Sequence, residues 1–215
     1  MDPTTSYKHA IPLSVLARFD FFETRNAGSI LRATNPEEFD DIISVLSGFA
    51  IDAASDISEA GGNESKTAAR LNRSFRYLGW REAAYSITIK GELVLKGPGR
   101  QGDKTSVSEQ ETTSYLIDNL KGRVAADVEW HAKDGNLDRD FAAYRALYEN
   151  GIIDVALMIT MSRDSMRQWA QRLDSSTKKF QTSTTTNLEK AKPRLIRGDG
   201  GGCPILVVAI CDRTT

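Results

Sequence analysis

The chain has 215 residues, of which 40% are hydrophobic, and its formal net charge at pH 7 is −1. This fits one domain with a sizeable core, and no apolar run approaches the roughly 20 residues that a membrane-spanning helix needs. Two cysteines lie in one apolar C-terminal stretch without a CxxC motif. This argues against a zinc site or a disulfide and favours free thiols in the cytoplasm.

Charge is unevenly distributed along the chain. Residues 37–64 hold eight acidic residues and no Lys or Arg, whereas residues 162–197 hold nine Lys or Arg against three Asp or Glu. The second region would give one face a positive potential that attracts phosphates. An ordinary solvated surface with uneven charge is the alternative.

Apolar spacing and turn residues predict the first half of the chain as two helices, a strand and a loop. In chain order these are a helix over 35–54 that begins at Asn35-Pro36, a helix over 64–78 that ends at Gly79, a strand over 84–95, and a polar, Gly-rich loop over 96–109.

In the second half, strands and helices alternate, which predicts an α/β sandwich around a mixed sheet. The expected elements are strands over 113–120 and 123–130, a helix over 138–150, a strand over 152–160, a helix over 162–173, a Ser/Thr-rich loop over 175–187, and a strand over 204–210.

Three acids lie on the two middle strands: Asp118, Asp127 and Glu129. A two-residue turn at Lys121-Gly122 would pair Asp118 with Ala125. Because side chains alternate along a strand, the three carboxylates would share one sheet face. Three like charges there need a cation, shifted pKa values or full hydration, and hard oxygen ligands favour Mg²⁺. An exposed strand face with scattered acids is the plainer alternative.

A longer motif surrounds these acids: Asp118-Asn119, Lys121-Gly122-Arg123, Asp127-Val128-Glu129-Trp130, Lys133-Asp134 and Asp138-Arg139-Asp140. Outside it lie Gly61-Gly62-Asn63-Glu64-Ser65-Lys66, Leu78-Gly79-Trp80-Arg81-Glu82, Tyr148-Glu149-Asn150-Gly151 and Gly201-Gly202-Cys203-Pro204-Ile205-Leu206-Val207. Together these residues resemble the BglII/BstYI-type restriction endonucleases, with BamHI a more distant relative. The resemblance spans roughly residues 60–211.

The resemblance implies an α/β fold with a restriction-endonuclease-like core, a variant of the PD-(D/E)xK nucleases, in which helices flank a central mixed β-sheet. One domain would fill residues 1–215, with a helical N-terminal part over about 1–80 and a catalytic core over about 81–215. The resemblance assigns Asp118 and Asp127 to metal binding. Glu129, where the wider superfamily has Lys, would orient or deprotonate the attacking water.

One residue departs from the family pattern. Asp127 stands where Glu is more usual, which retracts the carboxylate by about one methylene and could lower activity. A further upstream acid or amide is also typical of the family, and Asp103 and Glu111 are weak candidates for it.

Polar residues on either side of the acids are the candidate DNA contacts: Lys133, Asp134, Asn136, Ser162, Arg163, Asp164, Thr184, Thr185, Asn187 and Lys190. Those that follow the catalytic strand could reach base edges in the major groove, and an Arg at the start of the helix over 162–173 could read guanine. Helix N-termini also attract phosphate. Plain helix capping by Ser162 and Asp164 and a flexible, solvated loop over 182–187 are the alternatives.

The resemblance also implies a homodimer on a palindromic double-stranded DNA site, with the helices over 138–150 and 162–173 packed across the two-fold axis. A cognate DNA methyltransferase is the expected functional partner. The predicted function is a type II restriction endonuclease with Mg²⁺ as cofactor, a GATC-centred site and 5′ overhangs. Two alternatives stay open: a nuclease-fold DNA-binding protein with weakened or lost cleavage, and a metal-dependent phosphohydrolase of small substrates.

Overall fold

A mixed seven-stranded sheet forms the centre of the computed structural model, which describes residues 2–52, 66–99, 102–112, 114–130, 132–133, 135–173 and 184–215. The strands are, in spatial order, β1 (Pro3–Thr4), β2 (Phe19–Thr24), β9 (Ile205–Ile210), β8 (Val155–Met161), β7 (Val124–Val128), β6 (Tyr115–Lys121) and β3 (Arg81–Tyr85). Strands β7, β8 and β9 are parallel, and the other neighbours are antiparallel. The predicted α/β class with a mixed sheet is confirmed.

The central strands are buried on both faces, as their continuous apolar runs predict. Along β8, Val155, Leu157 and Ile159 enter one hydrophobic cluster, whereas Ala156 and Met158 enter the cluster on the opposite face. This alternation follows from the two-residue period of a strand. The sheet therefore separates two cores, and each needs its own covering of helices.

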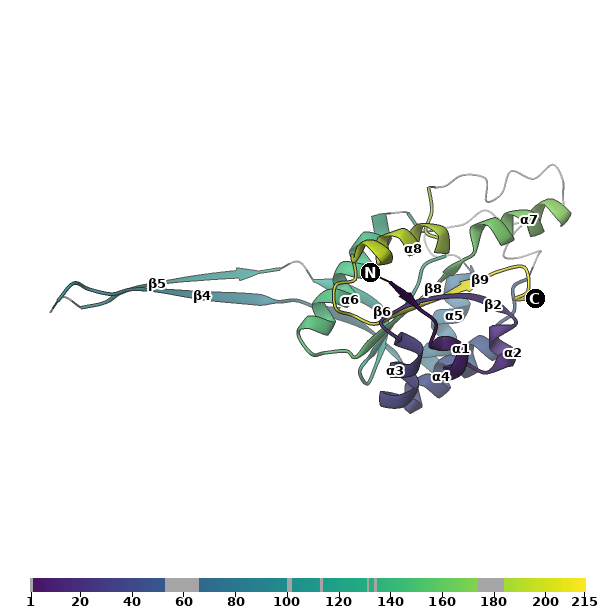
Figure 1. The fold of residues 1–215 in the computed structure, drawn as a ribbon, viewed down its shortest axis with the longest axis horizontal. Helices are drawn as coiled ribbons and strands as arrows, with labels where there is room; N and C mark the ends of the chain where they lie inside the picture. The colour runs from purple at the N-terminus through teal and green to yellow at the C-terminus, as the bar shows by residue number, and fades with distance from the viewer. Residues whose placement is uncertain are drawn as a thin grey trace.

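The helices form that covering (Figure 1). Six of the described helices contribute apolar residues to the first core: α1 (Tyr7–Ala10), α2 (Leu13–Leu16), α3 (Ala27–Thr34), α4 (Pro36–Gly48), α5 (Lys66–Tyr77) and α7 (Arg163–Leu173). The second core is covered by α6 (Gly135–Glu149) and α8 (Leu188–Arg197). Within the described ranges, no helix combines the length and the hydrophobicity needed to cross a membrane.

Strands β4 (Thr88–Leu95) and β5 (Lys104–Glu111) form a separate two-stranded antiparallel sheet. They prolong the hairpin of β3 and β6, whose paired ends are Tyr85 and Tyr115. Figure 1 shows this arm extending far from the body of the protein. Its larger apolar side chains are therefore exposed, and they are Ile89, Leu93, Val94, Leu95 and Val107.

Most strands and helices lie where the sequence predicts them, with four differences. The loop expected over 96–109 is wrong in part, because Lys104 begins β5. The helix expected over 35–54 ends at Gly48. Helix α8 was not predicted, since Pro193 in its middle is usually a helix breaker. The N-terminal part, expected to be helical, also supplies β1 and β2.

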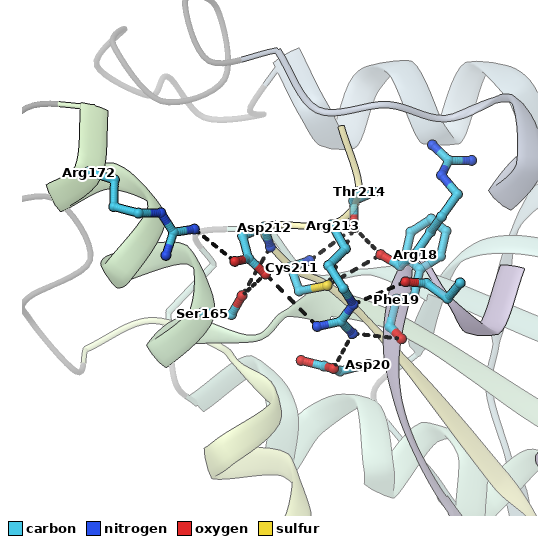
Figure 2. A network of polar contacts seen from close by, with 10 residues as sticks. Arg18, Phe19, Asp20, Ser165, Arg172, Cys211, Asp212, Arg213 and Thr214 are labelled. Atoms are coloured by element: carbon cyan, nitrogen blue, oxygen red, sulfur yellow. Dashed lines mark hydrogen bonds and ion pairs between the residues drawn. The ribbon is translucent and has the colours of Figure 1, made fainter.

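A polar network ties α7 to the end of β9 (Figure 2). Asp212 accepts hydrogen bonds from Ser165 Oγ (2.7 Å) and Arg172 Nη2 (2.8 Å), which lie two turns apart on α7. Next to it, Arg213 donates to Asp20 Oδ1 of β2 (2.7 Å). Because two points along the helix are held, its direction relative to the sheet is fixed.

The arm and the core should differ sharply in their contribution to stability. Replacing residues 86–114 by a four-residue turn should shift the unfolding midpoint by less than about 3 °C, because none of the described arm residues enters either hydrophobic cluster. As a contrast, Trp80→Ala removes a fully buried ring beside Phe75 and should cost about 3–5 kcal/mol. Thermal unfolding checks both variants. A loss from the arm deletion as large as that from Trp80→Ala would contradict this division.

Candidate active site

The hairpin of β6 and β7 carries the first two acids. Its ladder pairs Lys121 with Val124 and Asn119 with Ala126, so the turn is Gly122-Arg123. The predicted turn at Lys121-Gly122 is wrong by one residue, and the predicted pairing of Asp118 with Ala125 is therefore wrong by two residues. A shift of two residues keeps every side chain on its original face, because strands alternate with a period of two. The inferred shared face of Asp118 and Asp127 does not depend on this error.

Asp118 and Asp127 are joined by backbone hydrogen bonds. The Asp118 N–H donates to Asp127 Oδ1 (2.7 Å), and the Val128 N–H donates to Asp118 Oδ2 (3.3 Å). Carboxylate oxygens thus take backbone donors just where the regular ladder stops at Asn119. The register with β3 also shifts here, since Arg81 pairs with Leu120 but Ala83 with Ile117, which leaves one extra residue in β6. Such bulges re-aim side chains and are common next to active sites.

Glu129 follows directly after β7 and is 5% exposed. Its backbone is fixed on three sides. Its N–H donates to Ile159 O (2.8 Å), and its carbonyl oxygen accepts from Thr160 Oγ1 (3.0 Å) and Thr186 Oγ1 (3.1 Å). The residue therefore continues from the end of the strand in one defined position.

Helix α6 adds two polar side chains to the same region. Tyr144 is fully buried, donates to Leu157 O (3.2 Å) and lies within hydrogen-bonding reach of Asp127. Asp140 is 3% exposed and lies within hydrogen-bonding reach of Glu129. The structure thus brings together the three predicted acids and a fourth, Asp140, that was not proposed for the site.

The acids perturb one another because they are buried together. Burial, with the charges of Asp118 and Asp140, raises the pKa of Asp127 to about 8. Burial, with the charge and the hydrogen bond of Glu129, raises the pKa of Asp140 to about 8. The pKa of Glu129 is also raised, chiefly by burial. Such perturbed, clustered carboxyls are typical of functional sites.

The residues fit a hard divalent cation by donor type. All are carboxylates, which Mg²⁺ and Ca²⁺ prefer, and Glu129 Oε2 and Asp140 Oδ2 are buried without a hydrogen-bond partner in the described structure. Burial is the main cause of the raised pKa of Asp127, and a cation would offset the repulsion from Asp118 and Asp140 that adds to it. In the described residues, no three His, Cys, Asp or Glu side chains already stand in an arrangement that could hold a metal. The described side chains therefore do not form a complete set of metal ligands in this structure.

Two predicted DNA-contact segments meet beside Glu129. Lys133 and Thr185 form an isolated antiparallel bridge. The Thr186 N–H donates to Ala132 O (2.9 Å), next to its side-chain bond with the Glu129 carbonyl. Residues 184–187 are thus held against the chain that leaves the catalytic strand.

The predicted DNA contacts differ in accessibility. Lys133 and Thr184 are exposed, and Asn136 and Lys190 are half-buried. Asn187 is 1% exposed, and its Oδ1 accepts from the Lys190 N–H (2.9 Å) as the N-cap of α8. Its side chain is thus engaged within the protein. Asp134 lies outside the described residues.

The start of α7 holds the remaining predicted DNA contacts. Glu189 of α8 accepts hydrogen bonds from the N–H groups of Arg163 (3.1 Å) and Asp164 (3.3 Å). Ser162 is 7% exposed, and its N–H donates to Ile210 O (2.8 Å). The helix N-terminus that was expected to attract phosphate therefore already faces a carboxylate of the protein itself.

Sequence reasoning missed two of these polar residues. Asp140 lies on the apolar stripe of α6, three residues after Leu137 and four before Tyr144, and an acid on such a stripe is a signal of function. Glu189 gave no comparable signal, because its helix contains Pro193 and was not predicted.

The buried carboxyls predict an unusual pH dependence of stability without metal. Asp127 keeps its proton in the folded state up to about pH 8, whereas an unfolded Asp releases it near pH 4. Stability in EDTA should therefore fall as the pH rises through this window. Asp127→Asn cannot ionise, so between pH 6 and 8 it should lose roughly 1–3 kcal/mol less than the natural protein. Denaturant unfolding measures this, with the exposed Glu92→Gln as control, and equal losses would contradict it.

Comparison with known proteins supports the same assignment. The family described as restriction endonuclease BglII/BglIII matches residues 19–210. This range includes every strand of the main sheet except β1, and it also includes the arm strands β4 and β5. No curated protein matches the chain. Since the match covers most of the sequence and contains the whole acidic site, the chain belongs to the BglII/BglIII restriction endonuclease family and is a type II site-specific deoxyribonuclease.

Proposed function

We propose that the protein cleaves double-stranded DNA with Mg²⁺ as its cofactor, using Asp118, Asp127 and Glu129 as its catalytic residues. Asp118 and Asp127 would hold the metal, and Glu129 would act on the attacking water. The observation that carries this proposal is the contact between the two aspartates beside Glu129 at the edge of a buried sheet. Burying like charges is costly, so an arrangement of this kind indicates a cation.

Each acid has a distinct task in this proposal. Asp118 is half-exposed and would face the incoming DNA, whereas Asp127 is 4% exposed and would anchor the site from within. When bound, the divalent ion polarises the phosphodiester and stabilises the leaving oxygen. Glu129 orients a water molecule for in-line attack and accepts its proton. Its fixed backbone supports this role, because a catalytic base must hold its position to be effective.

The DNA is proposed to lie across the C-terminal end of β7 and the start of α7. Lys133 and Thr184 are exposed there, and Asn136 lies in the first turn of α6. These side chains can reach base edges or phosphates. Asp134, Ser162, Arg163, Asp164, Thr185, Asn187 and Lys190 stay candidate contacts, although capping and burial engage several of them.

The recognised site is proposed to be a GATC-centred palindrome, cut to leave 5′ overhangs by a homodimer. A two-fold protein matches a two-fold site, because each subunit then presents the same groups to each half. A cytoplasmic location and a cognate DNA methyltransferase belong to the same proposal, since the host's own sites need protection from the enzyme.

Plasmid digestion tests the proposal directly. The purified protein should produce discrete fragments with Mg²⁺ and none with EDTA, because the carboxylates would need the divalent ion to polarise the phosphodiester. Sequencing the fragment ends should give a GATC-centred site with 5′ overhangs. Fragments with other ends would refute the site assignment alone. Intact plasmids across varied sequences, with or without Mg²⁺, would refute cleavage itself.

Asp127 provides the sharpest test of the catalytic assignment. Asp127→Asn keeps the shape but removes the charge, and it should lower the cleavage rate by roughly 100-fold or more. Asp127→Glu should not increase the rate, because the extra methylene must fit a site that is 4% exposed and lies against Tyr144. Single-turnover cleavage measures both variants.

The alternative function, a DNA-binding protein with weakened or lost cleavage, predicts the opposite result. It follows from the shorter Asp at a position where Glu is more usual. Weak cleavage by the natural protein together with a large gain in Asp127→Glu would favour this alternative.

A further inference from the structure

A cavity of about 500 Å³ lies outside the acidic site. Its walls come from α1, α2, the first half of β2 and the first half of α8, and residues just after β8 and β9 complete it. None of Asp118, Asp127 and Glu129 lines it. The metal site therefore does not account for this cavity, and the cavity's own charges decide what it can bind.

The cavity lies at the same edge of the sheet as Glu129. Glu129 follows the end of β7, and the parallel strands β8 and β9 end on the same side. The antiparallel strand β2 begins there, because Phe19 pairs with Ile210. Neighbouring strands lie about 4.8 Å apart, so the three steps from β7 to β2 place the cavity roughly 14 Å from Glu129 along this edge. The segment that holds Glu129 through Thr186 also continues into the first turn of α8, which lines the cavity.

The acidic side chains of the cavity already have partners. Asp20 Oδ1 accepts a hydrogen bond from Arg213 Nη2 (2.7 Å), as Figure 2 shows. Glu189 accepts hydrogen bonds from the two backbone N–H groups that begin α7 (3.1 and 3.3 Å). The negative charges of both carboxylates are therefore offset within the protein.

Two lysines in the same cavity have no such partner. Among the described residues, no carboxylate forms an ion pair with Lys8 or Lys192. Lys8 is exposed, whereas Lys192 is half-buried with its ammonium group 5.9 Å from the centre of the Phe22 ring. Partial burial of an ammonium group against apolar walls is unfavourable unless an anion offsets its charge. The cavity thus presents two positive charges without a counter-charge, which suits an anionic ligand.

A phosphate of the DNA backbone is the anion that fits this place. Ser162, a predicted DNA contact, lines the cavity together with Lys8 and Lys192, and hydroxyl and ammonium groups are usual donors to DNA phosphates. The cavity also lies on the edge across which the duplex is proposed to run. Because a duplex rises about 3.4 Å per base pair, roughly 14 Å along this edge corresponds to about four base pairs.

We propose that Lys8 and Lys192 bind a backbone phosphate about four base pairs from the phosphodiester that is cut, and so hold the duplex on this edge without reading its sequence. This inference rests on the proposed function, because it needs duplex DNA across the sheet edge. Binding of DNA can nevertheless be measured without cleavage.

Duplex binding in EDTA at several salt concentrations tests the two lysines. The double variant Lys8→Met/Lys192→Met keeps the aliphatic stems and removes both charges. It should bind duplex DNA roughly tenfold more weakly, because a charged hydrogen bond is lost. Its plot of log affinity against log salt should also be less steep by about one, since one phosphate contact is missing. Equal affinity and slope in the double variant and the natural protein would overturn the proposal.

Arg197→Met is the matched control. It removes a cation from the same helix, at the end that leads to the start of β9, where Arg197 forms an exposed ion pair with Asp199. Its duplex affinity and salt slope should equal those of the natural protein. A loss as large as that of the double variant would show a general charge effect and overturn the assignment to this cavity.

Thermal unfolding in inorganic phosphate separates a DNA phosphate from a free one. A midpoint that rises with phosphate in the natural protein but not in the double variant, with equal duplex binding by both, would assign the cavity to a free phosphate compound and overturn the proposal. Weakened duplex binding by the double variant of a protein that never cleaves would uphold the phosphate site and refute the proposed function. Cleavage with unchanged duplex binding would do the reverse.

Discussion

The burial of several carboxyl groups against one helix is the constraint on which the rest of this structure depends. Asp127 and Asp140 both retain protons up to about pH 8 when no cation is present, because burial and mutual repulsion disfavour their ionised forms. Such a cluster lowers the stability of the metal-free fold at neutral pH. It persists only because the apolar sheet and α6 hold it in place, with Tyr144 packed at its centre. The stability given up here is what prepares the site to bind a cation.

The hairpin of β6 and β7 shows how a sheet accommodates these charges. Backbone N–H groups that would otherwise continue the ladder instead donate to Asp118 and Asp127. This places the two acids side by side at no cost in unpaired backbone groups. The extra residue in β6 lies at the same place, between Leu120 and Ile117, where the register with β3 shifts.

Sequence patterns could predict the central strands and the acidic site, because both depend on local rules. Continuous apolar runs identify β8 and β9, and alternation places Asp118 and Asp127 on one face despite an error of two residues in the pairing of the strands. The remaining features depend on contacts between distant segments. Nothing local to Lys104 shows that it begins a strand of the projecting arm, and Pro193 concealed α8. Asp140 was within reach of sequence reasoning, because a single acid interrupts an otherwise apolar helical stripe.

The backbone of Glu129 links the proposed DNA-contact segment to the proposed catalytic residue. Its carbonyl oxygen accepts hydrogen bonds from both Thr160 of β8 and Thr186, which belongs to the segment that bridges to Lys133. A nucleic acid that moves this segment must therefore act on the residue that is proposed to activate water. Helix α7 lacks this freedom, since Asp212 holds it at two points along its length. In the proposed complex, rigid α7 would set how the duplex docks, and the linked 184–187 segment would carry the consequence of docking into the site.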